Sequence, residues 1–435
     1  MQIKPIELAS LSDQRRAAIL RRSELDITSY MDKVRPIIDD VQRDGDAALA
    51  KYSARFDGVD EATYSPIASQ DELEEAAASL DPELKAAMTL AAENIQRYHE
   101  EQLPKEMWML EIRPGVLAGE KISPITSVGL YVPRGKGSFP SVMLMLGIPA
   151  KVAKVPSICV VTPPTAEGKV DAASAYAAKL CGIDRVYKVG GAQAIAALAY
   201  GTESIPRTLK VLGPGNAYVS AAKRLLYGKL DVGVPAGPSE SIILCDGSTD
   251  PEMAAVDLLI EAEHGPDSAA LLVTDSRAVA DAVCAKLPAL IDELPEPRKQ
   301  FCTHVFSNYG GVLLTESLDQ SIDFVNEFAP EHLEVLTEQP FEVLPRLVNA
   351  GEILLGPHAP ISLGNFSLGV NAILPTGGFA RTFSCVTVFD YLKRTSIGHV
   401  TKAGFDQIGP AARTLAQYEG FPSHDRALRF RQEKS

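Results

Sequence analysis

Apolar and polar positions follow two alternating periods through the middle of the chain, from Val128 to about Val234. Short apolar runs rich in β-branched residues are each followed by a longer, alanine-rich segment with helical spacing. The apolar runs read "VGLYVP", "SICVVTPP", "DRVYKVGG" and "TLKVLGPG". Strands that alternate with helices form right-handed βαβ crossovers, so this pattern predicts an α/β fold with a mainly parallel sheet.

Glycine-rich turns close three of these predicted strands: "VPRGKG", "VGGAQA" and "LGPGNA". In a parallel sheet, ligands bind beyond the carboxyl ends of the strands, and the helix after each turn favours an anion at its amino end. The turns therefore predict a nucleotide or other phosphate site. None is a G-x-G-x-x-G fingerprint, and an ordinary tight turn remains the alternative for each.

A second α/β pattern brackets the first. The apolar runs "SIILCDG", "AALLVTD", "GGVLLT" and "GEILLG" predict another sheet with helices between its strands. We expect the helical stretch before Val128 to pack on this second sheet, which makes that domain discontinuous. We expect the tail from Arg381 to be helical with little strand, and such an appendage suits a position across a partner subunit.

Composition and charge exclude several classes of function. The chain has 435 residues, of which 46% are hydrophobic and 23% charged, and its net charge is −14. A broad basic face for nucleic acid is therefore not expected. No apolar run approaches the roughly 20 residues of a membrane span, and the first residues lack the apolar core of a signal peptide. Six scattered cysteines without a Cys-x-x-Cys pair indicate a cytoplasmic protein.

The stretch "EAEHGPD", residues 261–267, ends a predicted helix. Glu261 and His264 are three positions apart and face the same way, so they can present an oxygen and a nitrogen to a divalent metal. The alternative is a helix carboxyl end at which a histidine interacts with the helix dipole.

The stretch "NEFAPEHLEV" places Glu331 beside His332, just after a proline. At a helix start both side chains can reach one pocket, where a carboxylate and an imidazole supply two proton-transfer steps. The alternative is an acidic first turn of a helix. Residues 359–381 are dense in glycine, serine and asparagine, which predicts a long loop of the kind that carries sites.

Several motifs, in order from about residue 25 to the end, resemble the histidinol dehydrogenase family. They read "GLYVP", "VGGAQAIAALAYGT", "GPGNAYV", "VPAGPSE", "EAEHGPDS", "NEFAPEHLEV", "LPTGGFAR" and "VFDYLKRTS". The resemblance implies oxidation of a primary alcohol through an aldehyde to a carboxylate, with two NAD⁺ and a bound zinc ion. It also implies an intertwined homodimer with two Rossmann-like domains.

The resemblance further implies roles for residues of this chain. His332 would be the base that takes the alcohol proton, and Glu331 would activate the water that attacks the aldehyde. Ser239 would contact the substrate. The tail would supply Glu419 as a substrate contact and His424 as a zinc ligand, from the partner chain. The NAD contacts would be the residues on the glycine-rich turns: Tyr131, Gln193 and Asn216.

The implied zinc ligands are Glu261, His264, Asn365 and His424, and two of them depart from the family pattern. Glu261 stands where the family has a glutamine, and Asn365 stands where it has an aspartate, so one negative charge is kept and moved across the metal. Because these four ligands would surround the reacting group, we also expect them to contact the substrate. Ala372 replaces a usual histidine.

Arg134 replaces a glycine of the family's "VPGG" and adds a cation for an anionic substrate. The default substrate is L-histidinol, as in histidine biosynthesis. The alternative is a divergent member that oxidises another polar or anionic primary alcohol, as sulfopropanediol dehydrogenase does. A two-lobed solute-binding protein is the alternative outside enzymes, and the Glu331–His332 pair argues against it.

These expectations give one domain plan. Residues 1–25 form an N-terminal helical arm, and residues 128–238 form a Rossmann-like NAD-binding domain. Residues 26–127 and 239–380 form a discontinuous α/β domain that carries the zinc and catalytic residues. Residues 381–435 form a C-terminal tail that completes the partner's site.

Overall fold

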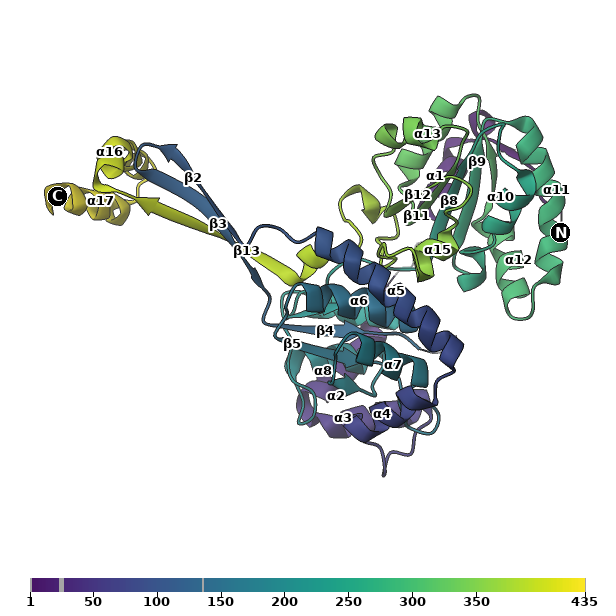
Figure 1. The fold of residues 1–435 in the computed structure, drawn as a ribbon, viewed down its shortest axis with the longest axis horizontal. Helices are drawn as coiled ribbons and strands as arrows, with labels where there is room; N and C mark the ends of the chain where they lie inside the picture. Colours follow the sequence, from purple (N-terminus) through teal and green to yellow (C-terminus); the bar gives the residue numbers. More distant parts are fainter. Residues whose placement is uncertain (1, 23–26, 135–136, 435) are drawn as a thin grey trace. The chain divides into compact units, whose positions relative to one another are not determined.

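The computed structural model describes residues 2–22, 27–134 and 137–434 (Figure 1). The chain divides into a large unit, Met1–Gln102 with Thr126–Tyr391, and a small unit, Leu103–Ile125 with Leu392–Ser435. The large unit holds two parallel sheets with helices between their strands, which confirms the predicted α/β class. Within the described ranges, no helix is long and apolar enough to cross a membrane.

The first parallel sheet has four strands in the order β6-β5-β4-β7. Each of its crossovers contains one helix, as the alternating pattern predicts. Gly135 and Lys136 of the first glycine-rich turn lie outside the described residues. The elements are β4 (Ser127–Tyr131), α6 (Pro140–Val152), β5 (Ser157–Val161), α7 (Ala172–Leu180), β6 (Val186–Tyr187), α8 (Gly191–Tyr200), β7 (Lys210–Leu212) and α9 (Ala217–Leu226).

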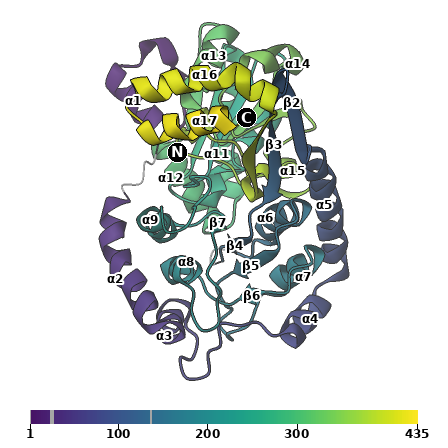
Figure 2. The same cartoon turned by 90° about the vertical axis from the view of Figure 1, so that its left-hand side faces the viewer.

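The helices that precede this sheet pack on it and form an outer layer on both sides (Figure 2). They are α2 (Thr28–Asp44), α3 (Asp46–Asp57), α4 (Gln70–Ser79) and α5 (Pro82–Glu101). Helix α2 lies on α8 and α9, while α4 lies on α7 and α5 on α6. The prediction that this stretch joins the second sheet is therefore wrong. Helix α2 has an apolar stripe of Val34, Ile37, Ile38 and Val41, but a stripe does not identify its partner.

The second parallel sheet has six strands in the order β1-β10-β9-β8-β11-β12. Its strands alternate between two cores: Ala270 and Leu272 of β9 pack with α10 and α11, while Leu271 and Val273 pack with α13. The elements are β1 (Ile6–Glu7), β8 (Glu240–Cys245), α10 (Pro251–Asp257), β9 (Ala269–Thr274), α11 (Arg277–Glu293), α12 (Arg298–Asn308), β10 (Gly311–Leu314), α13 (Leu318–Phe328), β11 (His332–Leu336), α14 (Pro340–Val343), β12 (Glu352–Leu355) and α15 (Ile361–Phe366).

The N-terminal segment is part of this six-stranded sheet rather than a separate helical arm. Strand β1 pairs with β10 at the sheet edge, and α1 (Asp13–Arg21) follows it. The predicted end of the arm at residue 25 lies outside the described residues.

The small unit contains a three-stranded antiparallel sheet and two helices. Strand β13 (Leu392–Val400) pairs with β3 (Val116–Pro124), which pairs with β2 (Met107–Arg113). Helices α16 (Lys402–Tyr418) and α17 (Pro422–Lys434) pack on each other. The prediction of little strand in the tail is wrong, because β13 extends over nine residues. Its partner strands lie far away in the sequence, and the tail alone carries no sign of them.

Candidate active site

The predicted proton-transfer pair lies at the amino end of β11. Helix α13 ends at Phe328, and Ala329 adopts a left-handed conformation (φ 54°) as its C-cap. The chain then passes through Pro330 directly into the strand. Glu331 and His332 therefore stand at the start of a strand, and the predicted helix start is wrong. Both residues are buried, and Nε2 of His332 is 3.9 Å from Oε1 of Glu331.

Three carboxylates surround the imidazole of His332. Nδ1 is 2.5 Å from Oε1 of Glu352, and Nε2 is 3.8 Å from Oε1 of Glu261 and 3.9 Å from Glu331. Burial favours the neutral ring, but the charges of Glu261, Glu331 and Glu352 outweigh it and raise the pKa of His332 to about 10. The carboxylates around the ring therefore favour its protonated form.

The candidate metal ligands of the large unit lie in the same cluster. Nδ2 of Asn365, on α15, donates to Oε1 of Glu261 at 2.9 Å, and Nδ1 of His264 is 3.5 Å from the other oxygen, Oε2. Ser239 joins them, because its hydroxyl is 3.1 Å from Nδ1 of His264. The predicted helix through "EAEHG" is shorter than expected. It ends at Asp257, and a 3-10 turn at Ala262–His264 presents the histidine.

The donors of this cluster fit a divalent metal. Glu261 is fully buried, and its Oε2 has no hydrogen-bond partner among the described residues. A buried carboxylate oxygen without a donor is costly unless it binds a cation. Among the described residues, no group of three or more His, Cys, Asp and Glu side chains is arranged around a metal position. Asn365 has an amide side chain and is not one of these four residue types. The fourth candidate ligand, His424, belongs to α17 of the small unit.

The pKa values of Glu261 and Glu331 are shifted in opposite directions. Burial raises the pKa of Glu261, but His332, His264 and the hydrogen bond from Asn365 bring it below its usual value. Burial raises the pKa of Glu331 well above its usual value, since Glu261 and Glu240 add to the effect and His332 only partly offsets it. Glu261 is therefore suited to hold a cation, and Glu331 is suited to hold a proton.

The three predicted NAD contacts lie at the carboxyl ends of the four-stranded sheet. Tyr131 ends β4, and its hydroxyl accepts the N–H of Gly191 at 3.2 Å. Gln193, in the first turn of α8, is buried and its Oε1 has no hydrogen-bond partner among the described residues. Asn216 is the N-cap of α9 and accepts from the N–H of Tyr218. An unpaired amide oxygen and two helix amino ends fit a cofactor with phosphates and amides.

Other predicted site residues lie outside the Glu261–His332 cluster. Arg134 follows β4, where its Nη1 donates to the carbonyl of Pro164 at 3.1 Å. The N–H of Ala372 faces the sulfur of Met145 at 3.4 Å. Glu419 is the C-cap of α16 and His424 lies in α17, both in the small unit. Their predicted roles stay predictions.

Two buried charges behind Glu331 were missed by the sequence analysis. The N–H of Glu240 donates to Oε2 of Glu331 at 2.8 Å, and Oε1 of Glu240 accepts from the N–H of Gly377 and lies 3.4 Å from Nε of Arg22. Burial raises the pKa of Glu240 to about 7, although Arg22 opposes this. The available signal was a glutamate at the first position of a mainly apolar strand, in "ESIILC". Glu352 carries the same signal in "EILL".

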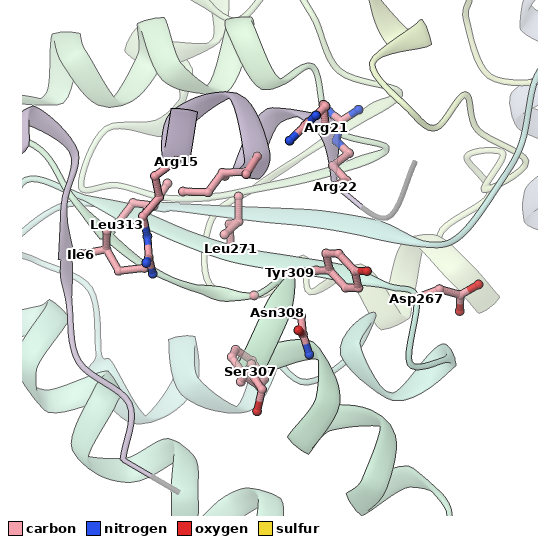
Figure 3. A pocket seen from close by; sticks show the side chains of 14 residues that line it. Ile6, Arg15, Arg21, Arg22, Asp267, Leu271, Ser307, Asn308, Tyr309 and Leu313 are labelled. Carbon is pink, nitrogen blue, oxygen red and sulfur yellow. The ribbon is translucent and has the colours of Figure 1, made fainter. Parts of the chain in front are cut away.

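A separate cavity of about 800 Å³ lies between α1, the end of α12 and strands β9 and β10 (Figure 3). Its walls include Arg15, Arg21, Arg22, Asp267 and Tyr309, and Figure 3 shows these side chains around it. The residues of the Glu261–His332 cluster are not among those that line it. Arg22 of this cavity lies 3.4 Å from Glu240, whose N–H donates to Glu331 of that cluster.

The fold and this cluster define an α/β protein in which buried carboxylates surround one imidazole, and comparison with known proteins identifies its family. The histidinol dehydrogenase family model matches residues 20–432. A histidinol dehydrogenase from Synechocystis sp. is 50% identical over 427 residues, which cover 98% of each chain. A histidinol dehydrogenase homolog from Cereibacter sphaeroides is 51% identical over 423 residues, which cover 97% of this chain and 96% of the homolog.

A solved structure agrees with these relatives. Histidinol dehydrogenase from Elizabethkingia anophelis superposes with a TM-score of 0.94 at 32% sequence identity, covering 99% of this chain and 98% of the other. This chain belongs to the histidinol dehydrogenase family and is a dehydrogenase.

Proposed function

We propose that this chain is a zinc-binding, NAD-dependent dehydrogenase that oxidises a primary alcohol through an aldehyde to a carboxylate. The observation that carries the proposal is the cluster in which one buried imidazole faces two carboxylates with opposite pKa shifts. Such a pair separates the tasks of cation binding and proton transfer. L-Histidinol is the default substrate, because the relatives at about half identity include a protein named histidinol dehydrogenase.

Glu261, His264, Asn365 and His424 of a partner subunit would hold the zinc, which would polarise the substrate oxygen as a Lewis acid. Glu261 contributes most to the raised pKa of His332. Engaging that carboxylate as a ligand lowers the pKa of the imidazole, which His332 needs to act as a base.

NAD⁺, when bound, would supply the hydride acceptor for both oxidations. In the first half-reaction, Nε2 of His332 accepts the hydroxyl proton of the alcohol. In the second, Glu331 accepts a proton from the water that adds to the aldehyde. Glu331 is held for this task by the N–H of Glu240. Tyr131, Gln193 and Asn216 bind the cofactor, and Ser239 and Glu419 contact the substrate.

The small unit supports a homodimer in which tails are exchanged. Every residue of β2 is exposed, including Leu110 and Ile112, and on α16 Tyr418 is 91% exposed. Several exposed apolar side chains close together on one surface indicate a protein–protein interface. The partner's tail brings Glu419 and His424 to the active site in this proposal.

A second candidate substrate is another polar or anionic primary alcohol. Four relatives at 46–51% identity are named as homologs of histidinol dehydrogenase. Moving the anionic ligand from position 365 to Glu261 changes the field and the hydrogen-bond donors that a substrate meets. Arg134 and Ala372 add to this difference, by resemblance.

The test is NAD⁺ reduction by zinc-loaded protein with L-histidinol, amino alcohols and anionic diols such as dihydroxypropanesulfonate. We expect NADH formation with at least one primary alcohol. Comparison of the alcohols that are oxidised fastest and slowest identifies the substrate class. Absence of NADH formation with every alcohol, from protein that contains zinc, would contradict it.

A further inference from the structure

Glu352 is the closest polar neighbour of the catalytic histidine, and no role in the proposed reaction has been given to it. Strands β11 and β12 pair in parallel with His332 directly opposite Glu352. The N–H of Glu352 donates to the carbonyl of Glu331 at 3.0 Å, which fixes this register. A slip of one residue would turn the carboxylate to the other face of the sheet. The backbone thus aims the side chain at the imidazole.

The contact determines which ring nitrogen carries a proton. A carboxylate only accepts hydrogen bonds, so Nδ1 of His332, 2.5 Å from Oε1 of Glu352, must be the donor. Nε2 is then the nitrogen without a proton when the ring is neutral. Nε2 is also the nitrogen that faces Glu261 and Glu331, at 3.8 and 3.9 Å. The reacting nitrogen therefore points toward the ligands of the proposed metal.

Packing leaves Glu352 little freedom to do anything else. Its side chain is 7% exposed. A Cβ atom placed on Gly364 of α15 would lie 3.0 Å from both of its carboxylate oxygens, so the absence of a side chain there makes room for the carboxylate. Gly364 precedes Asn365, the candidate metal ligand. The carboxylate is thus enclosed between the catalytic histidine and the helix that carries Asn365.

We propose that Glu352 is a positioning residue for His332. It accepts the Nδ1 proton, holds the ring with Nε2 toward the substrate hydroxyl, and stabilises the positive charge that the ring gains when it takes the alcohol proton. This inference rests on the proposed function, since it deepens the role of His332. Glu352 itself does not touch the reacting atoms.

The test compares Glu352→Gln with a matched control, Glu334→Gln, in the full-length, zinc-loaded protein. Glu334 lies on β11 two residues beyond His332, is also buried, and is paired with Asp257 instead of a histidine. Its pKa is raised to about 9, so glutamine replaces a carboxyl that is already neutral. Glu352→Gln should lower the rate of the first NADH formed in a single turnover by roughly 10²-fold. KM for the alcohol should change by less than about threefold. The control should stay within about threefold of the parent.

A double-mutant cycle separates positioning from general damage. If Glu352 acts only through His332, the variant His332→Ala, Glu352→Gln should be no slower than His332→Ala alone. L-Histidinol and dihydroxypropanesulfonate are both used as probes, and the faster one is carried through the cycle. Loss of rate that adds to that of His332→Ala overturns the inference, as does Glu352→Gln behaving like the control while His332→Ala is slow. If His332→Ala is as fast as the parent, the proposed function itself fails.

Discussion

At the scale of single residues, the site depends on how burial and nearby charges assign different states to similar groups. Glu261 has a lowered pKa because two imidazoles and an amide outweigh its burial, whereas Glu331 has a raised pKa because of its burial and of the two carboxylates beside it. The same side chain is therefore a ligand in one position and a proton carrier in the other. This division follows from three-dimensional neighbours such as Glu261 and Glu331, which stand 70 positions apart in the sequence.

Exchanging the proposed anionic ligand, Glu261, and the proposed amide ligand, Asn365, should change the amount of zinc that the protein binds. Glu261→Gln should lose most bound zinc, because it leaves no anionic protein ligand. Asn365→Asp should keep zinc but bind substrate poorly, because the site becomes doubly anionic. The double variant should recover zinc and shift preference toward L-histidinol. The measurements are zinc by mass spectrometry and KM by NADH formation. Glu261→Gln with full zinc and unchanged kinetics would mean that Glu261 is not a ligand.

The sequence made Glu261, His264, Glu331 and His332 visible because each stands in a short polar motif. Asn365 and Ser239 were reached only through the family resemblance. Arg22 and Glu240 were not reached at all, because a pair 218 positions apart leaves no local pattern. Glu352 was missed for the same reason, since its contact depends on which strand lies beside β11.

At the scale of elements, the amino end of β11 is where the site is assembled. Residue 332 points to the face that carries α15, and Glu334, two positions on, points the same way and forms a carboxyl pair with Asp257 on α10. Burial, followed by the charge of Asp257, raises the pKa of Glu334 from 4.5 to about 9. The pair joins the strand that carries His332 to the helix that leads to Glu261.

This carboxyl pair should make stability depend on pH. The folded state holds a proton on Glu334 up to about pH 9, while the unfolded chain releases it near pH 4.5. Stability from this group is complete below the unfolded pKa and declines as pH rises toward the folded pKa. Glu334→Gln should therefore raise Tm relative to the parent more at pH 8.5 than at pH 5.5, by a few degrees on the usual scale. A Tm difference that is the same at both values, measured by calorimetry, would show that the pair does not titrate.

Whether a segment forms a helix or a strand was predictable where the pattern of apolar and polar residues was regular, and less predictable elsewhere. The strands and helices from Val128 to Val234 follow their predicted order. The partner of α2 was not predictable, because either sheet can cover an apolar stripe. Strand β13 was not predictable either, because its pairing with β3 is formed between segments more than 260 positions apart.

At the scale of the whole molecule, the chain carries parts of one proposed site on two separate units. The large unit holds Glu261, His264, Ser239, Glu331 and His332, while the small unit holds Glu419 and His424. A homodimer that exchanges its small units would complete each site with residues of both chains.

Hybrid dimers should reveal this exchange. A chain with Glu331→Gln and His332→Ala, mixed with a chain with His424→Ala, should regain activity that neither has alone. Random exchange makes half the dimers hybrid, each with one intact site, so about a quarter of parental activity is expected. Different affinity tags isolate the hybrids, and the His424→Ala chain mixed with itself is the control. Isolated hybrids without activity would place both sets of residues in one chain's site.

The central claim is that this cluster takes an alcohol to an acid in two oxidations. The most direct measurement is the amount of NADH formed per molecule of alcohol consumed, with the product identified by mass spectrometry, for the parent and for Glu331→Gln. We expect two NADH and a carboxylate for the parent, and a shift toward one NADH and an aldehyde for Glu331→Gln, because that variant lacks the proton acceptor for water. One NADH per alcohol in the parent, or two in both proteins at equal rates, would contradict it.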